Sequence, residues 1–177
     1  MRHLKIFSFF IFILLACISA CKHETGEERG EVTREEQEKM VEVNKILVEK
    51  DAARIAAFVK RHNWDMTETS TGLWYMIYIK GKGIKAETGM IATIKYKIML
   101  LDGTLCYSSD KTGPKQFKIG QGGVESGLEE GILLMHEGDK ARFIMPPHLA
   151  HGLLGDNDKI PARAIILYEV ELINLEK

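Results

Sequence analysis

The sequence lacks an excess of charge of either sign, and no block of basic residues occurs in it. Its 177 residues hold 24 lysines and arginines against 25 aspartates and glutamates, which gives a formal net charge of −1. Proteins that bind nucleic acid gather lysine and arginine on one face or along one helix. The balanced composition therefore predicts no nucleic-acid partner.

A hydrophobic run long enough to cross a membrane is also missing. Arg2 and Lys5 precede an apolar run from Ile6 to Ala16 that only Ser8 interrupts. A basic start, a short apolar run and small residues before a cleavage point are typical of a secretory signal, whereas a spanning helix needs about 20 apolar residues. Residues 1–20 are therefore predicted to be a signal peptide.

The predicted signal ends in Ile18-Ser19-Ala20-Cys21, which resembles the lipobox of bacterial lipoproteins. The resemblance implies that Cys21 carries acyl chains and anchors the protein to a membrane, because stable anchoring takes more than one chain. The alternative is an ordinary signal that happens to contain cysteine. Residues 21–32 are almost wholly polar and are predicted to be a flexible tether between the lipid and the folded part.

Cysteine is scarce in the part of the chain expected to fold. Cys17 lies in the predicted signal and Cys21 is the predicted lipidation site, so Cys106 alone remains. One thiol cannot form an internal disulfide, so the core must stabilise the fold without one in an oxidising compartment. Cys106 also lacks a sequence context for a nucleophile, and we expect it to pack as a small hydrophobic side chain.

Sets of metal ligands at diagnostic spacing are absent as well. His148 and His151 are three residues apart, with Asp156 and Asp158 nearby, but no third ligand is clearly spaced. We interpret these residues as a loop with two histidines, and the sequence predicts neither a metal site nor a cofactor.

A helical pattern covers residues 33–63. Thr33 and Glu36 have the spacing of a capping box, and apolar residues then recur at helical spacing. This stripe consists of Val41, Val48, Ala52, Ile55 and Val59. Either the stripe packs on the protein's own domain, or it binds a second copy or a partner in an envelope complex.

Residues 70–177 change to the period of β-strands. Strands are predicted at 73–79, 90–100, 104–107, 116–119, 140–145 and 164–175, with the Asp102-Gly103 turn between the second and the third. A second capping box, Ser126 with Glu129, predicts a short helix through Met135. No alternation of strands and helices appears, so we expect an α+β domain with a twisted antiparallel sheet around one short helix. Residues 146–163 are too long for a plain connection and are predicted to be functional.

The segment from Gly89 to Glu176 resembles the FKBP-type peptidyl-prolyl cis–trans isomerases. The residues that carry the resemblance lie in order along the chain: Tyr96, Asp102-Gly103, Ser108-Ser109, Phe117, Ile119-Gly120, Gly127-Leu128-Glu129-Glu130-Gly131, His151-Gly152, Ile160-Pro161 and Tyr168-Glu169-Val170-Glu171-Leu172. With the lipoprotein signal and the helical stretch, the sequence is most similar to envelope members of gliding, Bacteroidetes-type bacteria.

The resemblance implies a site that needs no nucleophile, metal or cofactor. Its catalytic residues would be Tyr96, Phe117, Leu128 and Tyr168, and its substrate-binding residues Cys106, Tyr107, Val124, Glu125, His151 and Ile160. The backbone N–H of Glu125 would hold a substrate carbonyl.

The sequence departs from the family pattern at several of these positions. Cys106 stands where Phe is usual, Leu128 where Trp is usual, and His151 where a ligand-contacting Tyr is usual. Tyr107 replaces a polarising Asp, and Glu125 adds a charge at the rim. Two function classes follow. One is an isomerase that acts on X–Pro segments of exported proteins, in the periplasm or at the cell surface. The other is a non-catalytic module that binds proline segments or acts as a chaperone.

Overall fold

The computed structural model describes residues 33–177. The chain divides into two units between Met40 and Val41. The predicted signal peptide, the lipidation site Cys21 and the tether 21–32 lie outside the described residues. Within residues 33–177, no helix combines the length and the apolar character needed to span a bilayer.

Helix α2 (Arg34–His62) begins and ends as the sequence predicts. The N–H of Thr33 donates to Glu36 at 2.8 Å, and the N–H of Glu36 donates to the Thr33 hydroxyl at 3.3 Å, which is a capping box. Lys60, Arg61 and His62 occupy the last turn, and Asn63 follows with a left-handed φ of 52°. Local capping therefore fixes both helix ends.

The apolar stripe of α2 divides into two parts within the unit Val41–Lys177. Ile55, Phe58 and Val59 are buried, whereas Val41 and Val48 are exposed. The buried part packs against Ile144, Ile165 and Leu167 of the same unit. The expectation that the stripe packs on the protein's own domain is therefore met by the C-terminal half of the helix and not by Val41 and Val48.

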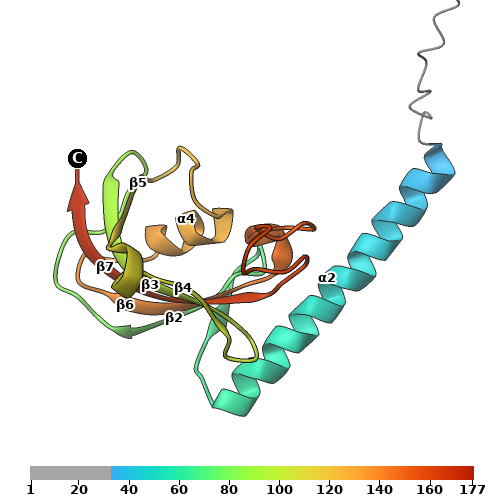
Figure 1. Ribbon diagram of the computed structural model, residues 1–177, viewed down its shortest axis with the longest axis horizontal. Helices are drawn as coiled ribbons and strands as arrows, with labels where there is room; N and C mark the ends of the chain where they lie inside the picture. The colour runs from blue at the N-terminus through green and yellow to red at the C-terminus, as the bar shows by residue number, and fades with distance from the viewer. Residues whose placement is uncertain (1–32) are drawn as a thin grey trace, which may run out of the picture. The chain divides into compact units, whose positions relative to one another are not determined.

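Every strand pairing in the sheet is antiparallel, and the sheet is accompanied by few helices (Figure 1). This arrangement confirms the predicted α+β class. Its order is β1-β2-β6-β7-β3-β4, and β5 pairs with β3. The strands are β1 (Thr67–Glu68), β2 (Trp74–Ile79), β3 (Ile91–Leu100), β4 (Leu105–Ser108), β5 (Lys115–Lys118), β6 (Lys140–Met145) and β7 (Ile166–Glu176).

The turn between β3 and β4 is the predicted one. Gly103 has φ of 89°, a left-handed value that suits glycine, and the Asp102 carboxylate accepts the N–H of Thr104 at 2.9 Å. The tight connection places Cys106 and Tyr107 of β4 beside the C-terminal end of β3, where Ile98 pairs with Tyr107.

Helix α4 (Ser126–Leu133) lies on one face of the sheet (Figure 1). Close approach requires glycine here, because a Cβ on Gly131 would lie 2.7 Å from the ring of Phe143. The second capping box is wrong. Glu125 is the N-cap residue without a side-chain cap bond, and Glu129 instead accepts the N–H of Gly122 at 3.0 Å. The Glu129 carboxylate therefore binds the loop before the helix instead of capping the helix end.

Two short helices and one strand have no counterpart in the predicted elements. They are α3 (Ser109–Thr112), the 3₁₀ helix η2 (Pro147–Leu149) and β1. Each has at most four residues, which is too few for a hydrophobic period to appear in the sequence.

The two faces of the sheet carry separate hydrophobic clusters. The larger inner cluster includes Phe143, Leu128 and Tyr168 and contains α4. The smaller outer cluster joins α2 to Ile144 and Leu167. Successive side chains of a strand point to opposite faces, so neighbouring residues of β6 and β7 supply both clusters.

Candidate functional site

The ten residues predicted for the site lie together on the inner face of the sheet. Buried in its core are Cys106, Phe117, Leu128, Ile160 and Tyr168, and Tyr96, Tyr107 and Val124 pack against that core. Glu125 and His151 contact each other beside Tyr168. The residues come from β3, β4, β5, β7, the start of α4 and the 146–163 segment, so the fold assembles the site from six elements.

The floor of the site is apolar and closely packed. Leu128 and Tyr168 are almost fully buried, and the rings of Tyr96 and Tyr168 lie with centroids 6.2 Å apart at a tilt of 41°. The Tyr96 hydroxyl lies 3.3 Å from that of Thr112. Such a floor can exclude water from a bound apolar group.

A carboxylate lies over this floor. The Tyr168 hydroxyl donates to Oε1 of Glu125 at 2.9 Å, and Nε2 of His151 lies 3.0 Å from the same oxygen without hydrogen-bond geometry. Burial raises the pKa of Tyr168, and the nearby charge and hydrogen bond of Glu125 raise it further. Tyr168 therefore remains a neutral hydrogen-bond donor.

The loop over the site is held by an aspartate. Tyr107 donates its hydroxyl to both Asp156 and Asp158, and the other oxygen of Asp156 accepts the N–H groups of Asp158 at 2.9 Å and Ile160 at 2.8 Å. Burial favours a higher pKa for Asp156, but these hydrogen bonds and the charge of His151 outweigh it and lower the pKa to about 2. Tyr107 thus fixes the loop that carries Ile160.

Cys106 packs as a small buried side chain. Its thiol donates to the carbonyl of Lys159 at 3.5 Å. Burial raises the pKa of the Cys106 thiol, and the charges of Asp156 and Asp102 act in the same direction. A protonated thiol is a weak nucleophile, so the geometry provides no activated sulfur.

The two histidines of the loop point to different partners. Nε2 of His148 lies 2.9 Å from the carbonyl oxygen of Thr71, whereas His151 faces Glu125. In the part of the chain that the structure describes, no three side chains of His, Cys, Asp or Glu converge as metal ligands.

One ion pair that supports the loop has no signal in the sequence. Arg163 donates from Nη2 to Asp51 of α2 at 2.7 Å, and its own N–H donates to the carbonyl of Gly152 at 3.1 Å. Arg163 adopts a left-handed φ of 56°, which is uncommon for a side-chain-bearing residue. The partners are 112 residues apart, so no local pattern could reveal the contact.

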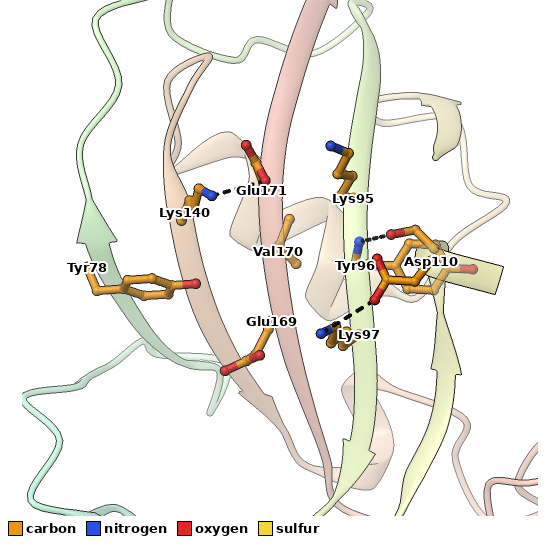
Figure 2. Close-up of a pocket in the computed structure, with 10 residues that line it drawn as sticks. Tyr78, Lys95, Tyr96, Lys97, Asp110, Lys140, Glu169, Val170 and Glu171 are labelled. Carbon is orange, nitrogen blue, oxygen red and sulfur yellow. Dashed lines mark hydrogen bonds and ion pairs between the residues drawn. The ribbon is translucent and has the colours of Figure 1, made fainter. Parts of the chain in front are cut away.

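A hollow with charged side chains along β3, β6 and β7 lies beside this site and shares Tyr96 with it (Figure 2). Lys140 of β6 pairs with Glu171 of β7 at 3.2 Å, and Lys97 of β3 pairs with Asp110 of α3 at 3.5 Å. This pairing is typical of a solvated sheet surface.

Solved structures with the same architecture are known. The crystal structure of AtFKBP13 aligns with a TM-score of 0.60 and 30% sequence identity over 62% of this chain and 98% of that chain. FkpA from Escherichia coli aligns with a TM-score of 0.60 and 27% identity over 82% of this chain and 74% of that chain. The class of the protein is therefore an FKBP-like domain.

Sequence relatives agree with this class. FkpA of Aeromonas hydrophila is 35% identical over 86% of this chain, and a probable FkpA of Neisseria meningitidis is 31% identical over 89%. This chain spans 59% and 58% of the lengths of these two relatives. The model of the FKBP-type peptidyl-prolyl cis-trans isomerases matches residues 82–173, and the chain belongs to that family.

Proposed function

We propose that the protein is a peptidyl-prolyl cis–trans isomerase that assists the folding of exported proteins. The observation that carries the proposal is the buried apolar floor of Tyr96, Phe117, Leu128 and Tyr168 under a loop fixed by Asp156. Membership of the isomerase family supports the same assignment.

The mechanism follows from the physics of the X–Pro bond. Rotation of the amide meets a barrier of about 18–20 kcal/mol, because the planar form is stabilised by resonance. A dry apolar pocket favours the twisted amide, which has lost that resonance and moved charge off its oxygen. Tyr168 and Leu128 supply the dry surface, and the backbone N–H of Glu125 is proposed to hold a substrate carbonyl.

An acid–base step is not required by this mechanism. Tyr168 stays protonated because its pKa is raised, and the Cys106 thiol stays protonated for the same reason. His151 is proposed to contact substrate rather than to transfer a proton.

Peptide isomerisation by the full chain in mild detergent tests the proposal. Tyr168→Ala should remove most of the turnover, whereas Leu172→Ala, a buried change further along β7 outside the site, should leave turnover intact in the folded fraction. A wild-type protein that binds proline peptides without accelerating their exchange would establish the non-catalytic binding module instead.

We further propose that the protein is a lipoprotein of the cell envelope, of the form found in Bacteroidetes-type bacteria. The support is the short apolar run that ends in Ile18-Ser19-Ala20-Cys21. The domain would then lie in the periplasm or at the cell surface. Cys21→Ser should leave an unprocessed or soluble protein in detergent-phase partitioning. A Cys21→Ser protein that is cleaved yet still enters the detergent phase contradicts lipidation.

A partner surface on α2 is the remaining proposal of function. Val41, Val43, Ile46 and Val48 are exposed apolar residues on the helix. They favour a homodimer or a complex with an envelope partner through helix 33–63. Sedimentation of the full chain in detergent, compared with Val41→Asp, tests the homodimer.

A further inference from the structure

Glu125 presents an unusual carboxylate to the candidate site. Its side chain is only 9% exposed, and its Oε1 accepts the hydroxyl of Tyr168 on the pocket floor. Its Oε2 is buried and has no hydrogen-bond partner among the described residues. A buried carboxylate oxygen without a donor is costly, so this atom is poised to accept a hydrogen bond from a ligand.

The neighbouring groups leave this oxygen unsatisfied. His151 faces Oε1 rather than Oε2, and its Nε2 itself has no hydrogen-bond partner in the described part of the chain. The carboxylate of Asp156 differs, because both of its oxygens accept hydrogen bonds from within the loop and from Tyr107. Unlike Asp156, Glu125 therefore keeps one buried acceptor oxygen available to a ligand.

The same residue also offers a donor. Within residues 33–177, the backbone N–H of Glu125 makes no hydrogen bond to the protein. A substrate carbonyl bound to this N–H would lie near the Glu125 carboxylate, because both groups belong to the same residue. The carboxylate would then face the side chain next to the bound carbonyl rather than a distant part of the substrate.

We propose that Glu125 makes the site selective for X–Pro segments that carry lysine or arginine beside the proline. This inference rests on the proposed isomerase function. A cation suits the oxygen best, because hydrogen bonds between ionised partners are shorter and stronger than neutral ones. Asp158, which accepts the Tyr107 hydroxyl at 3.1 Å, adds a second negative charge, whereas Lys159 lies over the ring of Tyr107, with its Nζ 4.7 Å from the centroid.

A simpler role for Glu125 is to accept the buried hydroxyl of Tyr168. Glu125→Gln separates the two roles, because the amide oxygen can still accept that hydroxyl while the negative charge is lost. Glu130→Gln is the matched control. Glu130 lies on α4, the helix that Glu125 precedes, but its carboxylate accepts the hydroxyl of Thr71.

The experiment measures kcat/KM of the full chain in detergent on Ala-X-Pro-Phe peptides with X as Lys, Met or Glu. The wild type should favour Lys over Met by about tenfold, which corresponds to one charge-assisted hydrogen bond. Glu125→Gln should bring the ratio of kcat/KM for the Lys and Met peptides to about one, whatever its effect on the absolute values, and Glu130→Gln should retain the wild-type ratio. Added salt should also reduce the preference in the wild type.

Two results would overturn the selectivity. One is a wild type that treats Lys and Met alike, and the other is a Glu125→Gln variant that loses turnover of all peptides equally. A wild type that turns over no peptide contradicts the proposed isomerase instead. The same three peptides in a binding titration then still test Glu125, because a Lys preference in affinity that disappears in Glu125→Gln would support it, and equal affinities would refute it.

Discussion

The two faces of the sheet are built from the same strands but are covered in different ways. Along β7, Tyr168 points inward to the candidate site, while Leu167 points outward to α2 and Glu169 pairs with Arg142 at 2.9 Å. The inner face is closed by α4 and the 146–163 segment, and its core includes Phe143. The outer face is covered by α2 at one end and carries paired charges at the other (Figure 2).

This difference assigns separate tasks to alternate residues of one strand. Inward residues form both the core and the floor of the site, so a change at a floor residue such as Tyr168 should alter stability and binding together. Outward residues attach a helix or face solvent, so changes on that face should alter stability while leaving the floor intact. The following changes test this separation, from the largest expected effect to the smallest.

Phe143→Ala should produce the largest loss of stability. Phe143 is fully buried in the inner cluster against Gly131, and truncation there leaves a cavity that costs about 3–5 kcal/mol. Urea denaturation of the full chain in detergent measures the free energy of unfolding. Tyr78→Ala on the exposed outer face is the control and should change it little. Equal losses in both variants would contradict the difference between the faces.

Ile55→Ala should destabilise the outer cluster by about 2–4 kcal/mol, because Ile55 is buried between α2 and the sheet. Turnover of X–Pro peptides by the folded protein should persist, since no residue of the floor is touched. Ile46→Ala on the same helix is the control, because that side chain is already exposed. A complete loss of turnover in folded Ile55→Ala would show that the faces are not separable.

Asp51→Asn tests the ion pair that links α2 to the loop over the site. The ion pair with Arg163 is partly open to solvent, since the Arg163 side chain is 32% exposed, so we expect a loss of about 1–2 kcal/mol, below the value for a fully buried pair. KM should rise more than kcat falls, because the loop carries Ile160. Glu49→Gln, an exposed acid on the same helix, should change neither constant.

The smallest expected effect is the loss of stability at acidic pH that comes from Asp156. The folded pKa of Asp156 is about 2, below the ordinary value of 3.8. Its contribution to stability is therefore fully present above about pH 4 and is lost as the pH falls through 2, because the unfolded state takes up the proton first. Tyr107→Phe removes a hydrogen bond that lowers this pKa, so the variant should lose less stability on acidification, and its loss should be complete at a higher pH. Thermal melts between pH 2 and 5 measure the difference, and overlapping curves would contradict it.

Much of the fold follows from patterns that lie close together in the sequence. The strands of residues 70–177 and the Asp102-Gly103 turn can be predicted because alternation and turn chemistry are local. The α4 capping box fails because Glu129 bonds to the loop before the helix. The exposed half of α2 could not be separated from the buried half, since Val48 and Ile55 have the same spacing signal and differ only in what lies opposite.

The candidate site divides in the same way. The ten residues could be named because their order along the chain resembles a known family, and the structure brings them together. The contacts between Glu125 and Tyr168 and between Arg163 and Asp51 could not be predicted. The first joins residues 43 positions apart and the second joins residues 112 positions apart. Both depend on side-chain directions that the sequence does not encode locally.

The buried thiol of Cys106 offers a way to measure how often the loop over the site opens. The thiol is shielded under the loop and, in the mature chain predicted here, is the single sulfhydryl left unmodified. Because Cys106 is buried, we expect an alkylating reagent to reach it only when the loop opens, so the labelling rate would report loop opening. Occupancy by a proline peptide would slow that rate, and residence in the site could then be timed without altering a single residue.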